Sequence, residues 1–170
     1  AEYAKEMVTG FIQLDGVTVG AVANRTAIYD ENGEKAEEFA AVLTTDGAYK
    51  AAEFVTFCNA FEIPVLSLTN VKGFEANVRA EKTIAKAAAK LVYAFSNADV
   101  PKVNVITGEA YGSAYVAMNS KSVGADMVYA WSQASIGMMD ASLAAKIMYA
   151  DEIAAADDVT AKINEKASEY

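Results

Sequence analysis

The residues best placed to do chemistry lie between positions 103 and 118, where a β-branched run is followed by a turn and then by small residues that predict a helix. The first backbone N–H groups of a helix have no partner within it, and they lie at the positive end of its dipole. Small side chains at Gly112, Ser113 and Ala114 let another molecule approach this backbone closely. Backbone donors at this turn could hold a developing oxyanion, but the segment alone favours a tight strand-to-helix turn in which glycine only permits the path of the backbone.

The chain contains no histidine, which excludes Ser-His-Asp and Cys-His catalysis and removes the commonest zinc ligand. No metal site is expected. The single cysteine, Cys58, lies among apolar residues at helical spacing and is interpreted as a buried thiol rather than a nucleophile. Chemistry in this chain must then depend on backbone donors, carboxylates, a bound cofactor or a partner chain.

Composition limits the classes of partner. With 170 residues, of which 54% are hydrophobic and 22% charged, the chain is expected to form one domain over residues 1–170 with a sizeable core. A net charge of −9 argues against nucleic-acid binding and against contact with anionic membranes. No apolar run approaches the roughly 18 residues that span a bilayer, and the polar first residues predict no signal peptide. We expect a cytoplasmic protein.

Segments that predict strands and helices alternate along the chain, as is typical of an α/β fold with mostly parallel strands. Asp15-Gly16 predicts a tight turn between the first two strands, and Asp46 is the expected N-cap of the first helix. A polar loop is expected around residues 30–34. The expected strands span 8–14, 17–23, 65–69, 103–106, 125–131 and 134–138, and the expected helices span 46–61, 76–97, 112–119, 140–150 and 159–168.

Several short phrases occur in an order and spacing that cover nearly the whole chain. They include Leu14-Asp15-Gly16, Gly73-Phe74, Val100-Pro101-Lys102, Ala110-Tyr111-Gly112 and Tyr129-Ala130-Trp131. Read together, they resemble the carboxyltransferase subunits of biotin-dependent acyl-CoA carboxylases and the related acyl-CoA decarboxylases. The resemblance implies the crotonase (ClpP-like) superfold, a spiral of ββα units with flanking helices. Members of this family carry two such domains, and this chain looks like the second, C-terminal one, without the N-terminal half that binds acyl-CoA.

The resemblance also implies a function: positioning carboxybiotin for carboxyl transfer to or from an acyl-CoA. In this family the biotin is carried on a separate biotin carboxyl carrier protein, and the substrate is a coenzyme A thioester. The N-terminal carboxyltransferase domain of another subunit completes the site, so a homo-oligomer is expected. The resemblance places the backbone N–H groups of Ser113 and Ala114, after Gly112, on the biotin ureido oxygen. It places these residues around the cofactor: Val71, Gly73, Phe74, Tyr111 and Tyr115.

The sequence departs from the family's pattern around the expected biotin site. Ser113 stands where a second glycine is usual, which keeps the N–H donor provided that this position does not need a positive φ. Gly108-Glu109 replaces a basic pair, and Asn70-Val71-Lys72-Gly73-Phe74 replaces Asp-Val-Pro-Gly-Phe. Trp131 is followed by Ser132 rather than by proline.

Two other functions are compatible with the same superfold. One is a catalytically silent domain that keeps the fold for assembly. Separately, the apolar stretch 136–139 and the absence of the other half predict self-association of this chain. The other is an acyl-CoA hydratase or isomerase, which needs paired carboxylates as acid and base. Asp126 and Asp140 are the acidic residues nearest the loops of interest. We interpret both as structural, because Asp126 precedes a strand and Asp140 fits a helix N-cap.

Overall fold

The computed structural model describes residues 2–169 and divides the chain into two compact units, one ending at Ile136 and the other beginning at Gly137. The two units are described separately below. The larger unit contains the sheets and their covering helices, and the smaller one is helical. Within the described residues, no helix is both long and apolar enough to cross a membrane.

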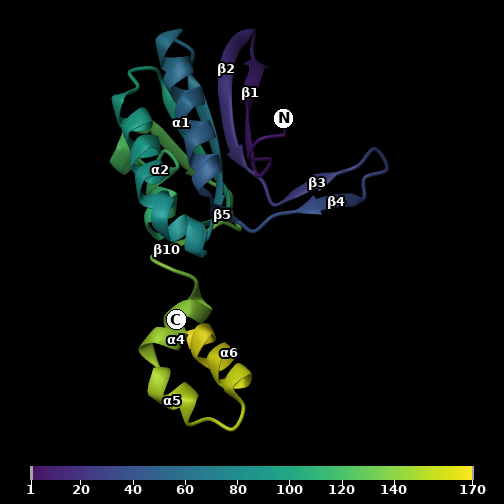
Figure 1. The fold of residues 1–170 in the computed structure, drawn as a ribbon, viewed down its shortest axis with the longest axis vertical. Coiled ribbons are helices and arrows are strands. Elements are labelled where there is room, and N and C mark those ends of the chain that lie inside the picture. Colours follow the sequence, from purple (N-terminus) through teal and green to yellow (C-terminus); the bar gives the residue numbers. More distant parts are fainter. Residues whose placement is uncertain (1, 170) are drawn as a thin grey trace. The chain divides into compact units, whose positions relative to one another are not determined.

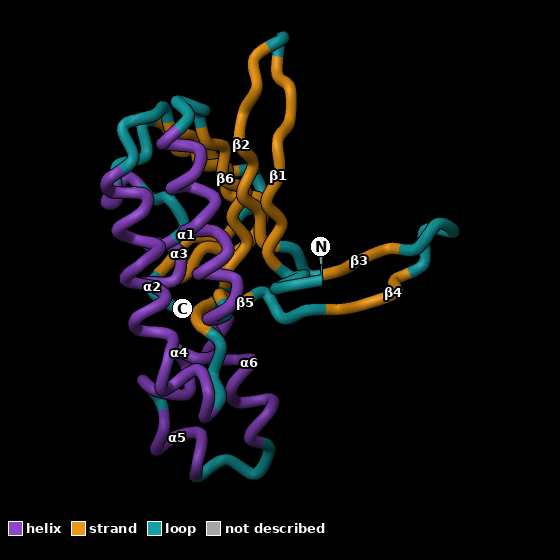
Figure 2. Tube along the Cα trace, turned by 45° about the horizontal axis from the view of Figure 1, so that its top comes forward, coloured by secondary structure: helices purple, strands orange, loops and turns teal. Residues whose placement is uncertain are grey.

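The main sheet is built chiefly from parallel strands (Figures 1 and 2). Its strands lie in the order β1-β2-β6-β8-β10, and β9 also pairs with β8. β1 and β2 form the predicted antiparallel hairpin, whereas β2–β6, β6–β8 and β8–β9 are parallel, which confirms the α/β class. The strands are β1 (Met7–Leu14), β2 (Val17–Asn24), β6 (Val65–Val71), β8 (Lys102–Tyr111), β9 (Met127–Ala130) and β10 (Ser135–Gly137).

Helices cover one face of this sheet. α1 (Thr45–Ala60) and α2 (Val78–Asn97) pack side by side, and both lie on the same side of the strands in Figure 2. The short α3 (Gly112–Ala117) packs against α2, β6 and β8, and the 3₁₀ turn η1 (Lys121–Val123) follows it. Along β6 the residues alternate between fully buried and half-buried, so the face away from the helices is only partly covered.

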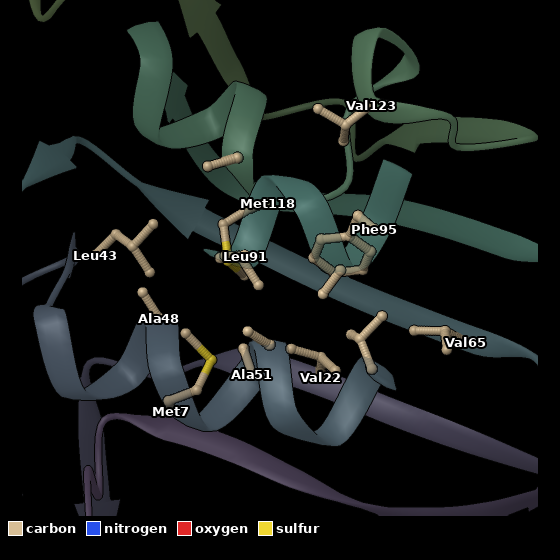
Figure 3. Close-up of a cluster of buried hydrophobic side chains, with 14 of the residues drawn as sticks. Met7, Val22, Leu43, Ala48, Ala51, Val65, Leu91, Phe95, Met118 and Val123 are labelled. Carbon is tan, nitrogen blue, oxygen red and sulfur yellow. The ribbon is translucent and has the colours of Figure 1, made fainter. Parts of the chain in front are cut away.

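The core lies between this sheet and the helices. Leu91 and Phe95 of α2 are completely buried, and Figure 3 shows them in a cluster that also contains Val22 of β2 and Val65 of β6. Alanines on both helices let the helix backbones lie close to the sheet and to each other. Cys58 belongs to the same cluster and is fully buried, and burial raises the pKa of its thiol. The interpretation of Cys58 as a buried thiol is confirmed.

We expect Gly20→Ala to destabilise the protein by about 1–3 kcal/mol because the core around β2 has no free space. A Cβ at position 20 would overlap the sulfur of Cys58 and lie 3.2 Å from the Phe54 ring. Gly10→Ala on β1 is the matched control, because nothing lies within 4 Å of a Cβ placed there. Thermal unfolding of both variants is the measurement, and equal melting temperatures would contradict the expectation.

The start of α1 corrects one prediction. Thr44, not Asp46, is the N-cap, and its hydroxyl accepts a hydrogen bond from the Gly47 N–H at 2.9 Å. Asp46 lies in the first turn, where a negative charge favours the helix dipole, and pairs with Arg79 at 3.0 Å. The helix ends at Ala60, and Phe61, the last residue of the helix predicted at 46–61, is 64% exposed.

Short strands occur where loops are expected. β3 (Ala27–Tyr29) and β4 (Lys35–Glu38) form an antiparallel hairpin that extends away from the main sheet (Figure 1). The polar residues 30–34 are therefore only its turn region. The charged, fully exposed sequence of β4 lacks the apolar alternation by which strands are recognised. β5 (Val42–Leu43) pairs in parallel with β7 (Gly73–Phe74) in a separate small sheet.

The smaller unit consists of three helices, α4 (Ala141–Met148), α5 (Ala150–Ala154) and α6 (Val159–Glu169). The helix predicted at 140–150 is thus two short helices with Tyr149 between them. Only Ala144, Ala145 and Ile153 are buried in their helices, and α6 buries none of its residues.

Candidate functional site

Strand β8 leads directly into the segment singled out from the sequence. The strand does not end near Ile106, as predicted, but continues through Gly108 to Tyr111. Gly112 then takes a φ of +57°, and α3 begins at this residue. L-residues with side chains rarely adopt this left-handed conformation, so the turn needs glycine at position 112. Ser113 is not among the residues with positive φ, and serine therefore fits where the family has a second glycine.

The first backbone N–H groups of α3 have no acceptor within residues 2–169. Tyr111, at the N-cap position, makes no capping hydrogen bond with its side chain, and no bond is formed by the N–H groups of Ser113 or Ala114. Ser113 lies exposed at the surface, whereas the Ala114 side chain is 1% exposed and packs into the core. The turn thus holds adjacent donors on a backbone that is anchored from beneath.

Polar side chains in the core fix the other end of α3. The Asn104 amide donates to the carbonyl oxygen of Met118 at 3.1 Å, and the Thr69 hydroxyl donates to Asn104 Oδ1 at 2.8 Å. All three residues are completely buried. The sequence analysis did not predict this hydrogen-bond network. Asn104, a polar residue at an inward position of the predicted strand, could have indicated it.

The β6–β7 connection, also implicated by the resemblance, lies beside α3 because β7 packs against that helix. Its residues differ in how much surface they offer. The side chain of Val71 is fully buried and belongs to the core cluster. Phe74 packs partly against the same core, and Gly73 has open space where a Cβ would be.

The two tyrosines that flank the turn are half-buried. Tyr115 lies on α3 and packs against the core cluster. Burial raises the pKa of the Tyr115 hydroxyl above its ordinary value. Tyr111, the last residue of β8, keeps part of its surface free next to Gly112.

Four departures from the family's pattern form two contacting pairs in the structure. Asn70 lies over Gly108, where a Cβ on residue 108 would come within 2.6 Å of the Asn70 side-chain oxygen. Lys72 and Glu109 form an ion pair at 3.3 Å. The ion pair partly neutralises the carboxylate of Glu109.

The two carboxylates of the hydratase alternative have structural partners. Asp126 accepts a hydrogen bond from the Lys102 backbone N–H at 2.7 Å, and its own N–H donates to the Lys102 carbonyl. Asp140 is the N-cap of α4 and accepts from the N–H groups of Ser142 and Leu143. These contacts agree with the structural interpretation of both residues.

Two cavities occur away from the turn. One, of about 570 Å³, is lined largely by charged side chains that include Glu6, Asp46 and Arg79. The other, of about 380 Å³, lies near Asn59 and Pro101. Neither cavity is lined by residues 112–114.

The chain as a whole is similar to a known family of proteins. Residues 1–170 match the model described as the carboxyl transferase domain. The chain is 43% identical over 169 residues to a putative propionyl-CoA carboxylase beta chain from Bacillus subtilis (strain 168), covering 99% of this chain and 31% of that protein. It is 42% identical over 171 residues to the methylmalonyl-CoA carboxyltransferase 12S subunit of Propionibacterium freudenreichii subsp. shermanii, covering 100% of this chain and 31% of that protein.

Solved structures share the fold. The transcarboxylase 12S structure with methylmalonyl-coenzyme A and methylmalonic acid bound superposes with a TM-score of 0.82 at 42% identity, over 98% of this chain and 30% of that chain. The beta subunit of geranyl-CoA carboxylase from P. aeruginosa gives a TM-score of 0.81 at 24% identity, over 99% of this chain and 30% of that chain, which shows the fold alone. The present chain therefore spans less than a third of the length of these relatives.

Proposed function

Because the chain belongs to the carboxyl transferase domain family, we propose that it is the C-terminal half of a biotin-dependent acyl-CoA carboxyltransferase and positions biotin for carboxyl transfer. The observation that carries this proposal is the pair of N–H groups at Ser113 and Ala114, which have no acceptor in the described chain. They lie at the position that the resemblance assigns to the biotin ureido oxygen. The direction of transfer and the acyl group are left open by the proposal.

The residues of the turn fit such a ligand. A ureido oxygen accepts hydrogen bonds, and the turn offers adjacent donors with only small side chains at positions 112 to 114. Biotin, when bound, supplies the carboxyl group and then a ring nitrogen that acts as base, so the chain needs no histidine of its own.

The contribution of the chain itself is preorganisation. Gly112 sets the turn, the core side chain of Ala114 holds it from beneath, and Ser113 leaves its outer surface open. Donors that are already oriented stabilise charge on an oxygen without rearranging during the reaction. Tyr111, Tyr115, Gly73 and Phe74 are proposed to form the wall around the cofactor, and Val71 contributes through the packing beneath it.

Assembly is part of the proposal. The relative of known structure is described as a hexamer assembly, and this chain spans 30% of its length. Parallel sheets are normally covered on both faces, yet the face of this sheet away from α1 and α2 is only half-buried. We propose that the N-terminal domain of another subunit completes the site with the acyl-CoA, and that a biotin carboxyl carrier protein delivers the cofactor in the cytoplasm.

The proposal is tested with the complete enzyme that contains this chain. The enzyme is supplied with a biotin carrier and with a carboxylated acyl-CoA whose transferable carboxyl group carries ¹⁴C. We expect label to move between acyl-CoA and biotin, and no label to move when the carrier is replaced by its biotin-free form. Hydration of an enoyl-CoA without biotin would instead identify a hydratase. No transfer of any kind from an assembled, folded enzyme would identify a silent assembly domain.

A further inference from the structure

The pairing of β6 with β8 is irregular just before the turn at Gly112. Thr69 pairs with Ile106 and Val71 pairs with Ala110, so one residue of β6, Asn70, faces a longer stretch of β8 at positions 107–109. Such a bulge bends a strand and redirects the residues that follow it. Here the residues that follow are the end of β8, Gly112 and the start of α3.

At the bulge, side-chain hydrogen bonds of Asn70 and Thr107 replace the interrupted backbone pairing. Asn70 Oδ1 accepts the backbone N–H of Glu109 at 2.9 Å. The Thr107 hydroxyl donates to the carbonyl oxygen of Thr69 at 3.3 Å. Gly108, between these residues, has no Cβ, and a Cβ would lie 2.6 Å from Asn70 Oδ1 and 2.9 Å from Asn70 Cγ. The Asn70 side chain therefore occupies this position only because residue 108 has no Cβ.

Asn70 is itself held by the neighbouring strand. The regular pairing of β2 with β6 includes Ala23 and Leu68, and Asn24 continues it with its side chain. Asn24 Oδ1 accepts the Asn70 N–H at 2.8 Å, and Asn24 Nδ2 donates to the Asn70 carbonyl oxygen. One amide side chain thus satisfies both backbone groups of Asn70. Hydrogen bonds run continuously from β2 through β6 to the bulge in β8.

We infer that Asn70 is a positioning residue, which sets the bulge in β8 together with Asn24 and Gly108 and thereby orients the N–H groups of Ser113 and Ala114. This inference rests on the proposed function for its catalytic meaning, but its structural part stands on the contacts alone. Asn70 acts on the turn through the backbone of β8, and no contact of Asn70 with a substrate is required.

A double-mutant cycle on the 170-residue chain tests the mutual requirement. We expect Gly108→Ala to lower the melting temperature by about 5 °C, because its Cβ would overlap Asn70. In the Asn70→Ala background, where this overlap is absent, the same substitution is expected to cost far less. Gly10→Ala is the matched control, since nothing lies within 4 Å of its Cβ. An equal cost of Gly108→Ala in both backgrounds would overturn the inference.

A second measurement separates positioning from stability. In amide NMR spectra of the chain, Asn70→Ala is expected to shift the signals of Glu109, Ser113 and Ala114, and Gly10→Ala is expected to leave them in place. Asn70→Asp, which keeps the acceptor oxygen, should restore the wild-type positions. Unshifted Ser113 and Ala114 signals in Asn70→Ala would also overturn the inference.

The catalytic consequence is measured in the complete enzyme. Asn70→Ala is expected to lower kcat for carboxyl transfer about 10-fold or more, with an unchanged KM for acyl-CoA, because only the biotin-facing turn is displaced. A raised KM for acyl-CoA at unchanged kcat would contradict the inference. If wild-type enzyme transfers no carboxyl group while the coupling and the NMR shifts persist, the proposed function fails and the positioning role of Asn70 is supported.

Discussion

Ser113→Pro is expected to lower the rate of carboxyl transfer by about 10²-fold, because proline removes one of the two backbone donors proposed for the oxyanion. Proline is tolerated in the first turn of a helix, where its missing N–H has no intrahelical partner. Ser113 is the second residue of α3, is exposed, and forms no backbone hydrogen bond through its N–H. The substitution is therefore expected to remove the donor with little loss of stability.

Ser113→Ala is the matched comparison, since it removes the hydroxyl and keeps the N–H. We expect this variant to retain most of the transfer rate. The measurement is the steady-state rate of label exchange between acyl-CoA and biotin in the complete enzyme, with thermal unfolding as a check on folding. Similar rates for the two variants would show that the Ser113 N–H takes no part in the reaction.

Asn104→Leu is expected to destabilise the chain by about 2–4 kcal/mol. Leucine is of similar size but cannot donate to the Met118 carbonyl oxygen or accept from the Thr69 hydroxyl. Thr69 and Met118 are completely buried, so their polar groups cannot form replacement hydrogen bonds with water. Because these bonds anchor the end of α3, the variant should also lower the rate of carboxyl transfer.

Thr107→Val is the control for this substitution. It also replaces a polar residue of β8 by an apolar one of similar size, but its hydroxyl makes a single bond at 3.3 Å and the residue is only half-buried. We expect a loss of less than about 1 kcal/mol. Chemical denaturation measures both values, and a loss below about 1 kcal/mol for Asn104→Leu would contradict the role given to this network.

Structure formed by neighbouring residues was predictable from the sequence. Asp15 and Gly16 adopt φ values of +48° and +80°, as a tight hairpin turn requires, and they produce the β1–β2 hairpin. The apolar spacing around Leu91 and Phe95 identified α2, and these residues are indeed at the centre of the core. Gly112 signalled the turn before α3, and its positive φ explains why glycine is there.

Predictions failed where distant residues decide the outcome. β8 continues to Tyr111 because β6, with Asn70, supplies partners beyond Ile106, and no local pattern around Gly108 reveals those partners. β3 and β4 form by pairing with each other, although the exposed sequence of β4 has no strand-like alternation. Thr44 rather than the predicted Asp46 caps α1, because the helix begins at Thr45.

The α/β class, the hairpin, the long helices, the glycine turn and, through the resemblance, the family were therefore predictable from the residues alone. These features depend on turn chemistry and periodicity over a few neighbouring residues, and on phrases spread along the chain. The contacts of Asn70 with Gly108, of Lys72 with Glu109 and of Asn104 with the end of α3 became visible in the folded chain. Such contacts join residues far apart in the chain, and their geometry exists only once the strands have paired and the core has packed.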